Sequence, residues 1–182
     1  MQRGLDQAFD EYLVLLAQGG SRAATARLAA RWTPKLLTFA ARTLGATETA
    51  KDAVQETWEA ALRGLRGLED PARFRAWLYA IAARKCADVL RDKYRGRRIA
   101  EAVAASAEPP TPDPASVADT SLDVAAALKL LPADQRVAVS LFFGEDLSVA
   151  EIANITGAPA GTVKSRLFAA RQTLRKHLGD VK

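Results

Sequence analysis

Cationic side chains repeat at helical spacing near the carboxyl end of the sequence, in the segment 159–178. At about 100° per residue, Lys164, Phe168, Arg171 and Arg175 share one face of a helix drawn through this segment. The apolar face, about a quarter-turn away, comprises Val163, Leu167, Ala170, Leu174 and Leu178. Cations on a free helix face bind phosphates and base edges, so the spacing predicts a DNA-binding helix. A solvated amphipathic helix that closes a bundle has the same periodicity and is the alternative.

A shorter helix is expected just before this segment, across a glycine turn. Ser148 and Glu151 have the spacing of a capping box at a helix start, and Gly157 suits the left-handed residue that ends a helix. Pro159 then suits the first turn of the following helix. Two helices joined in this way, the second one basic, are the pattern of a helix-turn-helix, which lays its second helix in the DNA major groove.

The segment 48–66 predicts a helix whose two faces differ in charge. Its apolar face comprises Val54, Trp58, Ala61, Leu62 and Leu65. Its polar face comprises Asp52, Gln55, Glu56 and Glu59. An acidic face is either solvated or a docking surface, and a basic protein surface is the partner that its charge favours.

The next segment, 71–94, combines cations with a tryptophan. Its core face is expected to comprise Phe74, Leu78, Ile81 and Val89. On an adjoining face, Arg73, Trp77, Arg84 and Arg91 are four, seven and seven residues apart. Guanidinium groups interleaved with an indole are typical of a groove for single-stranded nucleic acid, because cations hold phosphates while rings stack on bases. Trp77 is alternatively a core residue. The basic run 91–98 favours nucleic acid.

The periodicity of the whole chain is helical, which predicts an all-α fold. Glycine and proline breaks give expected helices at 5–18, 21–44, 48–66, 71–94, 122–131, 133–143, 148–156 and 159–178, the second of them kinked or split at Pro34. The stretch between the two groups is rich in alanine, proline and acid, with EPPTPDP at its centre. We therefore expect two small helical domains, 1–98 and 122–182, joined by a flexible linker at 99–121.

Other kinds of chemistry have little support in the sequence. The formal net charge of +5 favours a polyanionic partner. Cys86 is the lone cysteine and is expected to be buried, with a redox thiol as the alternative; His177 suits the end of the last helix. We expect no catalytic residue, metal site, cofactor or small-molecule substrate. We also expect no membrane insertion and a cytoplasmic location, since no apolar run reaches ~20 residues and the chain start is unlike a signal peptide.

Four stretches together resemble the extracytoplasmic-function sigma factors, group IV of the sigma-70 family, which give RNA polymerase its promoter specificity. The stretches are DAVQETW at 52–58, FRAWLYAIA at 74–82, LPADQRVAVSLFF at 131–143, and LSVAEIA with GTVKSRLFAAR at 147–171. They cover most of the chain outside the proline-rich stretch, in the order and spacing of that family.

The resemblance implies a function and a set of site residues. Core RNA polymerase would be contacted by Asp52, Val54, Gln55, Glu56, Trp58 and Glu59. The first domain, region 2, would open the minus-ten promoter element with Arg73, Phe74, Trp77, Arg84 and Arg91. The second domain, region 4, would read the duplex minus-thirty-five element with Gly161, Thr162, Lys164, Ser165, Arg166, Phe168, Arg171 and Arg175. An anti-sigma factor is the expected regulator, and the polymerase supplies all catalysis.

Two departures from the family pattern bear on promoter preference. Many relatives have asparagine where this chain has Arg84, and arginine where this chain has Ala169. Region 1.1 and a full region 3 are also missing from the pattern. Three other functions are alternatives for this sequence: a dimeric helix-turn-helix regulator, a sigma mimic that titrates an anti-sigma protein, and an enzyme of nucleic acid metabolism. The regulator leaves the acidic helix without a role, and the enzyme lacks a phosphate-binding glycine loop or zinc-ligand spacing.

Overall fold

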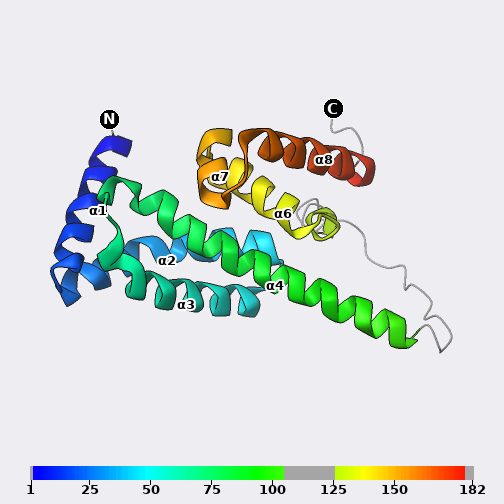
Figure 1. Cartoon of the computed structure of the whole chain (residues 1–182), viewed down its shortest axis with the longest axis horizontal. Helices are drawn as coiled ribbons and strands as arrows, with labels where there is room; N and C mark the ends of the chain where they lie inside the picture. Colours follow the sequence, from blue (N-terminus) through cyan, green and yellow to red (C-terminus); the bar gives the residue numbers. More distant parts are fainter. Residues whose placement is uncertain (1, 105–125, 179–182) are drawn as a thin grey trace.

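The computed structural model describes residues 2–104 and 126–178, with side chains described at 4–96 and 126–178. Helices joined by short turns account for these residues, and no strand occurs among them. Figure 1 shows helices α1 to α4 on one side and helices α6 to α8 packed along the other side of α4. We call the first group the N-terminal unit and residues 126–178 the C-terminal unit. The predicted all-α fold is confirmed.

The N-terminal unit begins with two antiparallel helices, α1 (Gln2–Gln18) and α2 (Arg22–Leu44). Ser21 caps the start of α2, since its Oγ accepts a hydrogen bond from the Ala24 N–H at 3.2 Å. Gly45 ends α2 in the left-handed conformation with φ 68°. Pro34 lies inside α2 and does not split it, contrary to one expectation.

Packing explains why α2 continues through its proline. Trp32, Leu36 and Phe39 flank Pro34, and all three are buried. Burying a large apolar side chain contributes about 1.5–3 kcal/mol. Three such residues therefore exceed the cost of about 3 kcal/mol for a proline in a helix interior. Helix α2 therefore continues through Pro34, because burial of its inner face in the core offsets the cost of the proline.

Helix α3 (Thr47–Gly64) leads through two short 3-10 turns, Leu65–Gly67 and Pro71–Arg73, into the long helix α4 (Phe74–Ala104). Asp70 caps the second turn, with its Oδ1 accepting from the Ala72 N–H at 3.0 Å. Helix α4 continues beyond residue 94, where the sequence predicted its end, and includes residues 99–104 of the predicted linker. The rest of that linker lies outside the described residues.

An aromatic cluster forms the centre of the N-terminal unit. Trp32 meets Phe74 and Tyr79 edge-on, with ring centroids 5.8 and 6.0 Å apart, and Phe39 meets Tyr79 at 5.6 Å. Edge-to-face pairs of this kind contribute about 0.5–1.5 kcal/mol each beyond their burial.

The buried face of α4 is wider than predicted. Phe74 and Leu78 are buried as expected, whereas Ile81 and Val89 are only half-buried. The fully buried set also includes Tyr79, Ala82, Ala83, Cys86, Ala87 and Leu90. Helix α4 has α2 and α3 on one side and the C-terminal unit on the other, so two of its faces are covered.

The C-terminal unit consists of a helical turn at 126–129, then α6 (Ala133–Val139), a π-helical turn (Ser140–Gly144), α7 (Val149–Thr156) and α8 (Ala160–Leu178). The predicted capping box is confirmed: Glu151 N–H donates to Ser148 Oγ at 3.2 Å, and Ser148 N–H donates to Glu151 Oε2 at 2.8 Å. Gly157 ends α7 with φ 65°, as predicted. The expected helix 133–143 is regular only to Val139.

The two units share one apolar core. Val137, Leu141, Leu147 and Ile152 of the C-terminal unit belong to the same buried cluster as Leu78 of α4 and its neighbours. A smaller cluster lies within the C-terminal unit and comprises Leu128, Leu131, Val139 and Ala170. The described structure is therefore a closed arrangement in which α6 and α7 lie against α4.

Candidate nucleic-acid interface

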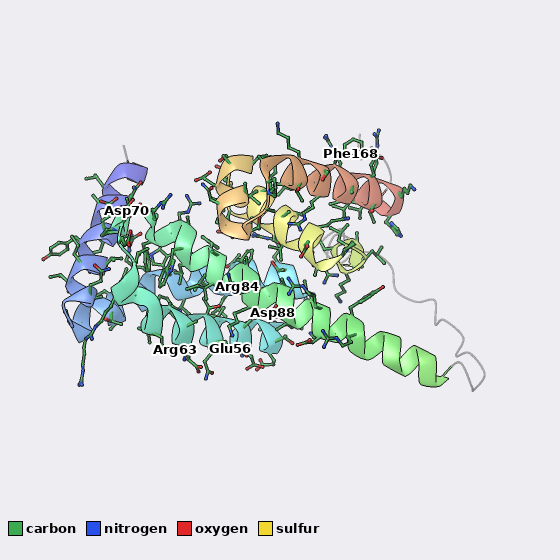
Figure 2. The ribbon with its side chains drawn as sticks, in the orientation of Figure 1. Glu56, Arg63, Asp70, Arg84, Asp88 and Phe168 are labelled. Carbon is green, nitrogen blue, oxygen red and sulfur yellow. The ribbon has the colours of Figure 1, made fainter. Side chains whose placement is uncertain are left out.

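The predicted DNA-binding face of α8 is turned away from the core. Val163 and Ala170 are fully buried, while Lys164, Ser165 and Arg171 are exposed and Phe168 is 65% exposed. Phe168 lies on the outer side of α8, away from α4 (Figure 2). Gly161 and Arg175 are also exposed, and Thr162 is half-buried. The structure thus places most of the predicted minus-thirty-five residues on one accessible surface, which we call the α8 face.

Arg166 is the exception among these residues. Its Nη2 lies 2.7 Å from Asp134 Oδ2 at the start of α6, and its side chain is only partly exposed. The guanidinium is therefore engaged within the C-terminal unit, where it ties α8 to α6. Arg166 therefore lies off the α8 face in this arrangement, and its contact with DNA stays a prediction.

Three of the polar residues predicted on α3, Asp52, Gln55 and Glu59, are exposed, and Gln55 Nε2 donates to Glu59 Oε1 at 3.2 Å. Glu56 is also exposed and forms an ion pair with Lys85 of α4, with Oε2 and Nζ 2.8 Å apart. Figure 2 shows Glu56 on α3 on the side of the molecule opposite to α8. These four residues form a continuous polar surface, which we call the α3 face.

Two residues predicted to contact core RNA polymerase, Val54 and Trp58, do not lie on the exposed α3 face. The packed face of α3 is also rotated from its predicted position. Val54 is 4% exposed and packs in the core, so it supports the helix instead of touching a partner. Trp58 is half-buried, and its Nε1–H donates to Thr33 Oγ1 at 2.9 Å. Leu62, expected on the packed face, is 53% exposed, and Thr57 is buried instead. Thr57 satisfies its hydroxyl by donating to the Ala53 carbonyl at 2.7 Å.

The predicted single-strand surface on α4 is partly accessible. Arg73 and Arg84 are exposed, and Trp77 is half-buried beside Phe74 with ring centroids 6.1 Å apart. Gly64 of α3 leaves room for the indole, because a Cβ there would lie 3.1 Å from Trp77 Cζ2. Trp77 therefore packs against Phe74 and Gly64 and remains partly accessible. Phe74 is 2% exposed, so in this closed arrangement it packs in the core and its predicted contact with DNA is not accessible.

Arg91, the last residue of that surface, is already paired. Its Nη1 lies 2.6 Å from Asp88 Oδ1, and its Nη2 lies 3.9 Å from Asp134 Oδ1 of the C-terminal unit. Asp134 thus stands between Arg91 and Arg166, one from each unit. We call the accessible remainder, Arg73, Trp77 and Arg84, the α4 ridge.

A polar contact between the two units was missed by sequence reasoning. Glu145 directly follows the π-helical turn, and its carboxylate accepts a hydrogen bond from the Tyr79 hydroxyl. The same carboxylate forms an ion pair with Arg42, with Oε1 and Nη1 3.4 Å apart. Arg75 Nη2 donates to the Glu145 backbone carbonyl at 3.0 Å. Burial raises the pKa of Tyr79 well above its usual value, and the Glu145 carboxylate raises it further. Tyr79 is therefore a hydrogen-bond donor here at any ordinary pH.

Arg136 of α6 makes a second contact of this kind. Its side chain is buried, with Nη1 3.4 Å from the Thr43 carbonyl at the end of α2 and Nη2 2.5 and 3.1 Å from the carbonyls of Lys129 and Leu131. Carbonyls at helix ends lack partners within their own helix, and a buried cation satisfies them.

Other chemistry is limited in the described part of the chain. Cys86 is buried, as expected, and burial raises the pKa of its thiol to about 12. Residues 2–104 and 126–178 contain no group of side chains able to hold a metal ion. No helix among the same residues is long and apolar enough to cross a bilayer.

Comparison with known proteins identifies the family. Residues 28–96 match the family described as Sigma-70 region 2, and residues 121–174 match Sigma-70, region 4. The chain is 30% identical to the RNA polymerase sigma-H factor of Pseudomonas aeruginosa, over 96% of either protein. It is 32% identical to the ECF RNA polymerase sigma factor SigM of Mycobacterium tuberculosis, over 97% of this chain and 88% of that protein. The chain belongs to the extracytoplasmic-function sigma factors. It is an alternative sigma factor, a transcription regulator of the sigma-70 family.

Solved structures agree with this assignment. The sigma factor is similar to CnrH in complex with the cytosolic domain of CnrY, with a TM-score of 0.68 and 31% identity over 96% of this chain and 99% of that one. It is also similar to the sigma factor RpoE of Bartonella quintana in complex with the anti-sigma factor NepR, with a TM-score of 0.66 and 29% identity over 86% and 98% of the two chains. The N-terminal unit corresponds to region 2 and the C-terminal unit to region 4.

Proposed function

We propose that this sigma factor docks on core RNA polymerase through the α3 face. Asp52, Gln55 and Glu59 are exposed there, and Glu56 has a single lysine as its partner. A ridge of acids on a basic protein is a poor surface for DNA and a good one for a cationic protein partner, because charge complementarity steers encounter. The buried neighbours Ala53, Val54, Thr57 and Ala61 hold the helix in place behind this surface.

We infer that the α8 face reads the minus-thirty-five element in duplex form. Lys164, Arg171 and Arg175 are exposed on a helix that follows a capped helix and a left-handed glycine turn. This geometry lets the second helix enter the major groove while the first supports it. The cations would position the unit on phosphates, and Ser165 and Phe168 would meet base edges.

We infer that the α4 ridge holds the opened minus-ten element. Arg73 and Arg84 supply cations, and Trp77 supplies an aromatic edge between them. Melting a few base pairs costs a few kcal/mol, which stacking of unpaired bases on aromatic side chains offsets at about 1–3 kcal/mol per base. Arg91 pairs with Asp88 of its own helix and lies 3.9 Å from Asp134, so departure of the C-terminal unit would remove one of the two acids beside its guanidinium.

Both elements cannot be bound in the closed arrangement. Elements about 25 base pairs apart lie about 85 Å apart along a duplex at 3.4 Å per pair. A compact chain of this length has a radius of gyration of only about 16 Å. We propose that the units separate on the polymerase as domains 1–98 and 122–182, with the part of the segment 99–121 that follows the end of α4 at residue 104 as the tether. Residues 105–125 alone would reach about 70 Å when fully extended.

We propose control by an anti-sigma factor and action in the cytoplasm, where core polymerase works. Support comes from the two similar solved structures, in which CnrH is bound to the cytosolic domain of CnrY and RpoE to the anti-sigma factor NepR. The closed arrangement is a form that such a partner would stabilise by binding both units at once.

The observation that carries the polymerase assignment is the exposed α3 face, and charge reversal tests it. Asp52→Lys should reduce co-elution with purified core polymerase on a sizing column by at least about tenfold in affinity. Asp92→Lys is the matched control, because Asp92 is an exposed acid on α4 outside the α3 face. Equal binding of Asp52→Lys and Asp92→Lys would refute the assignment.

A further inference from the structure

Three donors from two helices of the N-terminal unit converge on a single anionic residue of the C-terminal unit. Arg42 of α2 and Tyr79 of α4 contact the Glu145 carboxylate, and Arg75 of α4 contacts its carbonyl. Paired guanidinium groups with a hydroxyl are the donors that proteins use for phosphate oxygens. We propose that Arg42, Arg75 and Tyr79 form a phosphate-binding site for an unpaired DNA strand, occupied in the free chain by Glu145.

The contact is a built site and not a chance surface ion pair. The Glu145 side chain is 12% exposed, and Tyr79 is buried, so its hydroxyl must have an acceptor in this position. Gly144 allows the approach, because a Cβ there would lie 1.6 Å from Arg42 Nη1. Any side chain at 144 would displace the guanidinium from Glu145. The sequence at 144–145 therefore fits the Glu145 carboxylate to Arg42 and Tyr79, and its backbone carbonyl to Arg75.

A cavity of about 660 Å³ lies beside this anion site. The N-terminal unit lines it with the rings of Trp32, Phe74 and Tyr79, the cations of Lys35 and Arg75, and two acids, Asp6 and Asp10, which both pair with Arg31. The C-terminal unit lines it with Glu145, Leu147 and Glu151. Aromatic rings next to a cluster of phosphate donors are the arrangement that holds a nucleotide of a single strand. In the closed chain the C-terminal unit forms one wall and adds two further acids, Glu145 and Glu151, so it excludes a polyanion from the cavity.

The position of the cavity suits a strand that continues from the α4 ridge. Pro71 and Ala72 of the turn before α4 line it, and the exposed Arg73 follows directly. An unpaired strand running along Trp77 and Arg73 would pass around this end of α4 to reach Arg75. The inference rests on the proposed function of region 2 and adds to it a site that becomes available only when region 4 leaves.

An acidic segment of a partner protein would also satisfy two arginines. The aromatic lining and the adjoining cationic ridge favour nucleic acid instead, because unpaired bases stack on aromatic rings and carboxylate side chains do not. The test therefore compares a homopolymeric deoxythymidine oligonucleotide with polyglutamate as competitors for the same site.

The test uses the full chain without polymerase. Glu145→Lys places a cation between Arg42 and Arg75, which should open the units and raise the radius of gyration in X-ray scattering. Affinity for a labelled deoxythymidine oligonucleotide should then rise about tenfold, which is the gain in affinity expected from one or two charge-assisted hydrogen bonds. Glu48→Lys makes the same charge change on the exposed start of α3 and should give less than about a twofold gain.

A second substitution separates the site from the new lysine. Arg75→Gln added to Glu145→Lys should leave the chain expanded and abolish most of the gain, whereas Arg27→Gln added to Glu145→Lys should not. If circular dichroism shows that Glu145→Lys does not fold, Glu145→Gln replaces it with the same expected order of affinities.

Three results would overturn the proposal: no gain over Glu48→Lys, a gain that survives Arg75→Gln, or stronger displacement by polyglutamate than by unlabelled oligonucleotide. Core polymerase binding by the wild-type chain is measured separately. A chain that binds polymerase and still shows any of these results retains its proposed function and loses only this site.

Discussion

The buried Arg136 gives the sharpest stability prediction, because it joins the two units from inside. Arg136→Met keeps an apolar stem of similar length and removes the guanidinium that contacts the carbonyls of Thr43, Lys129 and Leu131. Hydrogen bonds to a charged group contribute about 1.5–3 kcal/mol each, and a buried carbonyl left without a partner costs about 1–3 kcal/mol. One of the three contacts is long, at 3.4 Å, and solvent will reach some of the freed carbonyls.

We therefore expect Arg136→Met to lower the free energy of unfolding by about 3–5 kcal/mol. For a chain of this size, that corresponds to a fall in Tm of about 10 °C. Thermal and urea denaturation followed by circular dichroism measure both quantities. Arg27→Met is the matched control, because Arg27 is exposed on α2, and it should change stability by less than about 0.5 kcal/mol. A Tm for Arg136→Met within about one degree of wild type would refute the structural role of this arginine.

Three further predictions concern DNA and the thiol. Lys164→Ala and Arg171→Ala should each weaken binding of a duplex carrying the minus-thirty-five element and reduce the slope of log affinity against log salt by about one; an unchanged slope would remove that residue from the interface. Trp77→Ala should reduce permanganate reactivity of unpaired thymines at the minus-ten element in the holoenzyme, and a thermal melt of the same variant shows how much of the loss is unfolding. Cys86 should react with a disulfide reagent at pH 8 far more slowly in the native chain than in urea, since its raised pKa keeps it protonated until about pH 12; equal rates would contradict its burial.

Local rules account for what the sequence predicted well. The capping box at Ser148, the left-handed glycine at 157 and the apolar stripe through Val163 and Ala170 depend on neighbours within one or two helical turns. The sequence itself therefore contains the information that a helix-turn-helix requires. The acidic α3 face was predicted for the same reason.

Nonlocal packing explains what the sequence did not show. Val54 and Phe74 belong to motifs of the family, but motif membership does not separate a residue that touches a partner from one that supports the helix behind it. Leu62 is exposed because the packed stripe of α3 is rotated toward Thr57, and that rotation is set by where α2 and α4 lie. Periodicity within a single helix carries no such information.

Contacts between the units were beyond sequence reasoning altogether. Glu145 meets Arg42, Arg75 and Tyr79 across more than sixty residues of chain in each case, as the separations of 103, 70 and 66 show. Arg166 was assigned to DNA because it lies in a DNA-binding motif, yet its nearest anion, Asp134, is on another helix. Only the fold brings these charges together.

The central claim is that one acidic surface binds polymerase while two cationic surfaces bind promoter DNA. Transcription of genomic DNA by purified core polymerase, with and without this chain, followed by sequencing of RNA 5′ ends, tests it most directly. We predict new start sites that share two upstream elements centred near minus ten and minus thirty-five, lost with Asp52→Lys and kept with Asp92→Lys. The same start sites with core polymerase alone, or new sites without a shared element, would contradict the account.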